Sequence, residues 1–137
     1  MAERRLVLRT DGAARGNPGP AGAGFVIEAD DGSVIDSGWV YLGKRTNNQA
    51  EYEALICCLE ALEPDLPTHL TVYSDSELMV RQLNGEYRVK DPDLKDRFIW
   101  ASQILLRIGS VSVEHVSRSD NEQADDLANQ AIDEHFS

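Results

Sequence analysis

One stretch of the chain decides the fold: QAEYEALICCLEAL, which runs from Gln49 to Leu62. Its large apolar residues recur at the i, i+3, i+4 spacing of a helix that buries one face; they are Tyr52, Leu55, Ile56, Leu59 and Leu62. At about 100° per residue, Glu53 and Glu60 point away from this stripe, whereas Glu51 falls inside its margin. A charge in that position costs on the order of several kcal/mol unless another group pairs with it. Glu51 is therefore the first candidate for a functional residue.

The composition predicts one globular domain that spans residues 1–137. The apolar fraction of 42% and the charged fraction of 27% are ordinary values for such a domain, and the length suffices to bury a core. The chain has no run of eighteen apolar residues, so we expect no membrane span. Its first residues lack the apolar centre of a signal peptide, which predicts a cytoplasmic location.

The charge of the chain is strongly acidic. The net charge of −11, from 24 acidic and 13 basic residues, argues on its own against a nucleic-acid partner, because phosphate binding is normally driven by Lys and Arg. The simplest explanation is an acidic surface that keeps the protein in solution. A metal site would account for a few of these acids but not for all of them.

Periodicity and turn residues predict three strands, a helix, a strand, two helices, a strand and a last helix. The predicted strands are 6–11, 25–29, 33–41, 70–73 and 111–116. The predicted helices are 49–62, a short helix that ends at Leu83, 93–108, and a last helix capped by Asp120. Residues 13–24, AARGNPGPAGAG, are predicted to form a turn region because they are rich in Gly and Pro. This order implies an α/β fold with a mixed sheet and helices packed against it.

Four acids stand out in this arrangement. Asp11 and Asp75 lie at the C-terminal ends of two predicted strands, where open α/β sheets place their sites, and Glu51 and Asp125 lie in the first turns of helices. All four could converge on one spot, where their mutual repulsion would require a counter-ion. Oxygen ligands without His or Cys favour Mg²⁺ or Mn²⁺ over zinc. Two such ions about 4 Å apart would activate a water and stabilise the leaving oxygen of a phosphodiester displacement.

Each acid also has an ordinary structural explanation. Asp11 could belong to a turn, and Asp125 could be a solvated acid that the helix dipole favours. Asp75 lies in the sequence Ser74–Glu77, which has the spacing of a capping box, and Glu51 could complete a similar box at its own helix.

Four motifs in chain order resemble type 1 ribonuclease H. They are Thr10-Asp11-Gly12 with Gly16-Asn17-Pro18-Gly19, then Thr46-Asn47-Asn48-Gln49-Ala50-Glu51, then Ser74-Asp75-Ser76, and finally Asn121-Glu122-Gln123-Ala124-Asp125. The resemblance implies a ribonuclease H-like fold with a five-stranded mixed sheet whose second strand is antiparallel to the rest. It also implies an endonuclease that hydrolyses the RNA strand of RNA/DNA hybrids by a two-metal-ion mechanism and leaves 3′-hydroxyl and 5′-phosphate ends.

The resemblance also assigns roles to individual residues. The four acids, Asp11, Glu51, Asp75 and Asp125, match the catalytic metal ligands of the family, which hold two Mg²⁺ or Mn²⁺ ions when substrate is bound. Asparagines at three positions match residues that contact the minor groove of the hybrid, where 2′-hydroxyls are displayed; these are Asn17, Asn47 and Asn48.

Further expectations concern the substrate and the assembly. Thr46, together with Lys44, resembles an anchor for a phosphate of the DNA strand. Helix capping is the alternative role for Asn47 and Asn48. Duplex RNA is a second candidate substrate, and we expect a monomer.

The chain departs from the family pattern in two places. Many members carry a basic insert that grips the hybrid, but here residues 85–92 (GEYRVKDP) run straight to the next helix. Together with the net charge, this predicts weak and salt-sensitive binding to the hybrid. The loop before the last helix usually supplies a mobile His that assists product release or proton transfer, and the resemblance makes Arg118 the candidate catalytic residue for that role here. His115 lies nearby but is more typical of a strand end.

Three other classes of protein share part of this pattern. A non-catalytic hybrid-binding module would keep the asparagines but would not need four acids. A different nuclease of the same superfamily, such as a junction resolvase, would keep the acids but not the asparagine motifs. A protein-interaction domain would explain the charge but not Glu51.

Overall fold

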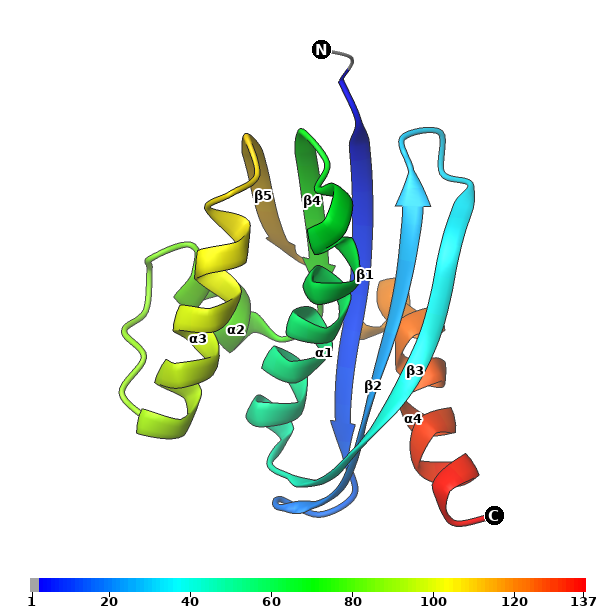
Figure 1. The fold of residues 1–137 in the computed structure, drawn as a ribbon. Coiled ribbons are helices and arrows are strands. Elements are labelled where there is room, and N and C mark those ends of the chain that lie inside the picture. The colour runs from blue at the N-terminus through cyan, green and yellow to red at the C-terminus, as the bar shows by residue number, and fades with distance from the viewer. Residues whose placement is uncertain (1–2) are drawn as a thin grey trace.

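The computed structural model describes residues 3–137, which form a five-stranded sheet with helices on both faces (Figure 1). The strands are β1 (Arg5–Ala14), β2 (Gly19–Ala29), β3 (Val34–Arg45), β4 (His69–Ser74) and β5 (Ser110–His115). The helices are α1 (Asn47–Leu62), α2 (Glu77–Leu83), α3 (Pro92–Leu105) and α4 (Glu122–His135), with short 3-10 turns at Glu63–Asp65 and Arg118–Asn121. α1 and α3 cover one face of the sheet, and α4 lies on the opposite face, behind β2 and β3 in Figure 1.

The sheet has the order β3-β2-β1-β4-β5 and is mixed. β2 runs antiparallel to both β1 and β3, whereas β4 is parallel to β1 and to β5. The predicted fold class, with an antiparallel second strand, is therefore confirmed. The parallel pairing of β1 with β4 ends at Thr10 and Ser74, while β1 continues to Ala14 beside β2 alone. This difference in length leaves a notch at the C-terminal end of β4.

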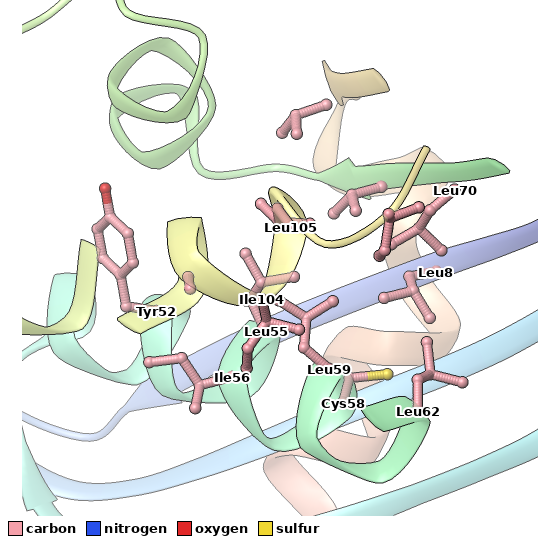
Figure 2. Close-up of a cluster of buried hydrophobic side chains, with 14 of the residues drawn as sticks. Leu8, Tyr52, Leu55, Ile56, Cys58, Leu59, Leu62, Leu70, Ile104 and Leu105 are labelled. Carbon is pink, nitrogen blue, oxygen red and sulfur yellow. The ribbon is translucent and has the colours of Figure 1, made fainter. Parts of the chain in front are cut away.

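The main core lies between the sheet and the helices α1 and α3 (Figure 2). The helical stripe predicted from the sequence is buried here, and Figure 2 shows it facing Leu8 and Leu70 of the sheet and Ile104 and Leu105 of α3. Burial of a large apolar side chain contributes about 1.5–3 kcal/mol, so this contact holds α1 firmly on β1.

The turn region expected over residues 13–24 is too long, because β1 extends to Ala14 and β2 begins at Gly19, so the chain reverses over residues 15–18. Gly16, with a φ of 101°, lies in this turn, whereas Gly22 and Gly24 of β2 serve close packing. A Cβ atom at Gly22 would lie 2.2 Å from the carbonyl oxygen of Ala128, and one at Gly24 would lie 2.2 Å from that of Ala124. The absence of side chains on β2 therefore lets α4 approach the sheet closely.

Helix boundaries also differ from the prediction, most clearly at the end of α3 and at the start of α4. α3 ends at Leu105, before the expected end at Ile108, because the chain turns there to enter β5. The last helix begins at Glu122 rather than after a cap at Asp120. A 3-10 turn comes first, in which the Ser117 hydroxyl accepts a hydrogen bond from the Asp120 N–H at 3.3 Å. Among residues 3–137, no helix combines the length and the apolar character that a membrane crossing requires.

The close approach of α4 can be tested with Gly24→Ala. The added methyl would meet the backbone of Ala124, which cannot rotate away, so we expect the free energy of unfolding to fall by about 1–3 kcal/mol. Gly38→Ala is the matched control, since a Cβ there first meets the ring of Phe25, which can shift. Urea denaturation of both variants measures the difference, and equal stabilities would contradict the packing described.

Candidate active site

Two acids meet at the notch between β1 and β4. Asp11 follows Thr10, the last β1 residue in the parallel register, and Asp75 follows its partner Ser74. The C-terminal ends of parallel strands share one sheet edge, so the two carboxylates come together. Asp11 is buried, with 4% of its surface exposed, and Asp75 is half-buried.

The cap of α1 is Thr46, not Asn48. The Thr46 hydroxyl accepts a hydrogen bond from the backbone N–H of Gln49 at 3.2 Å, and the Gln49 side chain accepts one from the Thr46 N–H at 3.0 Å. This capping box leaves no capping role for Glu51, whose ordinary structural explanation is therefore wrong.

The cap of α2 is Ser76, not Ser74. The Ser76 hydroxyl accepts a hydrogen bond from the N–H of Met79 at 3.2 Å, and the Ser74 hydroxyl accepts one from the Ser76 N–H at 3.1 Å. The capping box expected from Ser74 to Glu77 is therefore wrong, and the Asp75 carboxylate is directed to the notch.

The position of Glu51 depends on Gly12. A Cβ atom at Gly12 would lie 2.2 Å from the carbonyl carbon and oxygen of Ala50, so a side chain there would push α1 away from β1. The close approach brings the Glu51 carboxylate over the strand, where its Oε1 accepts a hydrogen bond from the Gly12 N–H at 2.7 Å. Only 9% of Glu51 is exposed. The acid at the margin of the apolar stripe thus faces the notch.

Three of the acids form a tight cluster. Carboxylate oxygens of Asp11, Glu51 and Asp75 all lie within 4.8 Å of one another. Burial raises the pKa of Asp11 strongly, and the charge of Glu51 raises it further. Burial also raises the pKa of Glu51, and the charge of Asp75 adds to the effect. Full ionisation of the cluster is therefore unfavourable unless a cation compensates the negative charge.

The fourth acid, Asp125, comes from the first turn of α4. Its carboxyl neighbours that of Asp11 and contributes to the raised pKa there. Its Oδ1 accepts a hydrogen bond from the side-chain amide of Asn129 at 3.3 Å, and its Oδ2 lies 3.6 Å from a guanidinium nitrogen of Arg118. The structure thus brings all four predicted acids to one place, although they come from four separate elements.

The acids line a cleft of about 440 Å³. Its walls also include Arg15, Asn47, Arg118 and Asn129, and its lining holds no His or Cys among the described residues. Hard divalent cations such as Mg²⁺ prefer oxygen ligands of this kind. The donor set and the unfavourable ionisation of the cluster both fit a divalent metal centre.

Two of the predicted asparagines are held in place by hydrogen bonds that their side-chain oxygens accept from backbone N–H groups. The Asn47 Oδ1 accepts a hydrogen bond from the Ala14 N–H at 3.2 Å, and the Asn17 Oδ1 accepts one from the Asn47 N–H at 3.0 Å. These bonds join the β1–β2 turn to the start of α1. Both asparagines are exposed, so their amide N–H groups are available to a ligand.

The remaining predicted residues are Thr46, Asn48, His115 and Arg118. Thr46 is half-buried at the cap of α1, and Asn48 is exposed in the first helical turn. His115 ends β5 opposite Ser74 and is not among the described cleft residues, whereas Arg118 lines the cleft with 78% of its side chain exposed.

Two residues of the cleft were not predicted from the sequence. Asn129 follows Asp125 by four positions, a spacing at which helix side chains touch, so the contact could have been found. Arg15 reaches Asn129 from a loop 114 positions earlier in the chain, and no local pattern signals that contact.

The comparisons with known proteins agree with this geometry. The family described as "Reverse transcriptase-like" matches residues 9–131. Ribonuclease HI of Halobacterium salinarum is 44% identical over 124 residues, which cover 90% of this chain and 62% of that protein. A bifunctional protein of Mycobacterium tuberculosis is 39% identical over 130 residues, which cover 94% of this chain and 36% of that protein. The crystal structure of LC11-RNase H1 in complex with an RNA/DNA hybrid matches with a TM-score of 0.91 and 42% identity, covering 96% of this chain and 99% of that chain.

The fold and the acid cluster thus define the ribonuclease H-like class of proteins. The chain belongs to the ribonuclease H family, and within it to the short type 1 group. It spans only part of the two curated relatives described above, 62% and 36% of their lengths.

The raised pKa values predict how pH affects the metal-free protein. A carboxyl whose pKa is higher in the folded state binds its proton more tightly there, so it stabilises the fold at low pH. This stability is lost as pH rises above the ordinary value of about 4. Asp11→Asn should therefore unfold with a higher free energy than the wild type at pH 8 in chelator, and the gain should shrink at pH 5.

Chemical denaturation at the two pH values measures this difference. Asp30→Asn is the control, since it removes the same charge from an exposed position. A gain at pH 8 that is equal in the two variants would show that net charge, and not the cluster around Asp11, causes the effect.

Proposed function

We propose that this chain is an endonuclease that hydrolyses the RNA strand of RNA/DNA hybrids and leaves 3′-hydroxyl and 5′-phosphate ends. The observation that carries the proposal is the convergence of four carboxylates, from four elements, on one cleft where their full ionisation is unfavourable without a cation. The hybrid bound to the similar LC11-RNase H1 supports this substrate. Duplex RNA remains a second candidate substrate.

The four acids would hold two divalent ions, Mg²⁺ or Mn²⁺. When bound, such ions supply Lewis acidity at the phosphate and lower the pKa of an attacking water. Asp11 is close enough to Glu51, Asp75 and Asp125 for each of them to affect its pKa, so the shared metal centre would depend on this ligand most. The Gly12 N–H fixes the Glu51 carboxylate by its hydrogen bond, which reduces the rearrangement needed on metal binding.

The asparagine pair would recognise the minor groove of the hybrid. The carbonyl oxygens of Asn17 and Asn47 already accept hydrogen bonds from the backbone, so each side chain presents its N–H₂ group outward. An amide donor can bond to a 2′-hydroxyl or to a base edge without regard to sequence. Asn48, exposed one residue farther along α1, would extend the same surface.

Thr46 and Arg118 would contact the phosphate backbone. The Thr46 hydroxyl only accepts a bond in its capping role, so its proton can be donated to a phosphate of the DNA strand. The exposed guanidinium of Arg118, which lines the cleft, would assist turnover.

The single domain over residues 1–137, the monomeric state and the cytoplasmic location stay predictions from the sequence.

The acidic surface determines how strongly the hybrid is expected to bind and how binding depends on salt. With a net charge of −11, binding should be weak, and the divalent ions must offset the repulsion between cleft and phosphate. The contacts that do form with phosphates release counter-ions from the hybrid. We expect binding to weaken as salt rises.

Asp11→Asn tests the assignment. The wild type should cleave the RNA strand of a labelled hybrid with Mg²⁺ or Mn²⁺ and not with chelator, and the variant should lose activity by at least about a hundredfold, because the ligand on which the metal centre depends most is gone. Asp30→Asn should keep wild-type activity. Full activity in Asp11→Asn would overturn the proposal, and analysis of the product ends checks the predicted chemistry.

Asn47→Asp tests the recognition of the hybrid. The new carboxylate keeps the acceptor for the Ala14 N–H, so the loop stays in place, but it cannot donate to the minor groove. We expect KM for the hybrid to rise about tenfold, in line with the loss of one or two hydrogen bonds, while kcat changes little. Gln130→Glu adds the same charge to an exposed part of α4 and is the control. An equal KM in the two variants would contradict the role of Asn47.

A further inference from the structure

We propose that Asn129 is a positioning residue for the fourth acid, and that Arg15 fixes the orientation of its amide. The inference rests on the proposed function, because it assigns Asn129 to the metal-binding role of Asp125. It adds a residue from the third turn of α4 and one from the β1–β2 loop to the site.

Asn129 is attached to Asp125 by two hydrogen bonds. Its Nδ2 donates to the backbone oxygen of Asp125 at 3.0 Å and to the carboxylate Oδ1 at 3.3 Å. The guanidinium of Arg118 lies 3.6 Å from the other carboxylate oxygen, Oδ2. Asp125 is thus restrained through both oxygens, although 19% of its side chain is exposed.

Arg15 determines the orientation of the Asn129 side-chain amide. Its Nη2 donates to the Asn129 Oδ1 at 3.3 Å and lies 3.4 Å from the backbone oxygen of the same residue. Guanidinium is only a donor and carboxylate is only an acceptor. An amide placed between them has one satisfied orientation, with its oxygen toward Arg15 and its nitrogen toward Asp125.

Arg15 is itself held in place. Its Nη1 forms an ion pair with Asp133 of α4 at 2.7 Å, and its backbone N–H donates to the oxygen of Pro20 at 2.8 Å across the loop. The loop that carries Asn17 is therefore connected through Arg15 and Asn129 to a predicted metal ligand. Movement of this loop on hybrid binding would be transmitted to the carboxylate.

A purely structural role would give a different result. If the contacts only fasten the loop to α4, their loss lowers stability and leaves the metal affinity unchanged. If they position Asp125, their loss weakens metal binding, as removal of residues that orient metal ligands does elsewhere, by roughly 10–100-fold. Metal affinity therefore separates the two roles.

The test measures Mn²⁺ binding by calorimetry, without substrate, for the wild type and for Asn129→Leu, which keeps the size but not the hydrogen bonds. We expect the dissociation constant to rise at least about tenfold, and kcat on the hybrid to fall with little change in KM. Arg15→Ala should shift the constant in the same direction by a smaller factor, because Asn129 can still reach Asp125 but is no longer oriented. Gln130→Leu, at an exposed neighbouring position, is the matched control.

An unchanged Mn²⁺ affinity in folded Asn129→Leu would overturn the inference. If that variant does not fold, Asn129→Ser decides the question by the same measurement. The outcome is separable from that of the proposed function. A wild type that binds Mn²⁺ but does not cleave the hybrid refutes the activity alone, whereas a cleaving enzyme whose Asn129 variants bind Mn²⁺ normally refutes the positioning role alone.

Discussion

The contact between the backbones of α1 and β1 at Gly12 is the constraint on which the site depends. A side chain at this position would collide with the Ala50 carbonyl group, so the helix could not lie where the Gly12 N–H reaches the carboxylate of Glu51. Burial of the apolar stripe of α1 stabilises the position of the helix against the repulsion between the buried acids. Core packing thus offsets the electrostatic cost of the site.

The same principle operates on the opposite face of the sheet. Gly22 and Gly24 let the backbone of α4 approach β2 as closely as Gly12 lets α1 approach β1. The result is that Glu51 and Asp125, carried by helices on opposite faces, both reach the notch left where β4 ends. Four carboxylates from distant parts of the chain are held together by steric fit and not by any local attraction between them.

The sequence predicted the elements and the convergence of the four acids better than it predicted the contacts that hold these acids in place. Helical spacing located α1, and the position of Glu51 at the margin of its stripe correctly indicated a special environment. Gly22 and Gly24 were misread as turn residues because chain reversal and close packing both favour glycine, and only the position of α4 distinguishes the two roles. The link from Arg15 to Asn129 joins residues far apart in sequence, so no periodicity or motif could signal it.

Mn²⁺ binding to Glu51→Gln measures the central claim most directly, since the side chain keeps its size and can still lie over Gly12. If the packing of α1 serves to deliver a metal ligand, calorimetry at pH 8 should show saturable binding to the wild type. The affinity of the variant should be lower by at least about tenfold, with equal or greater stability in chelator. Wild-type Mn²⁺ affinity in folded Glu51→Gln would contradict the account.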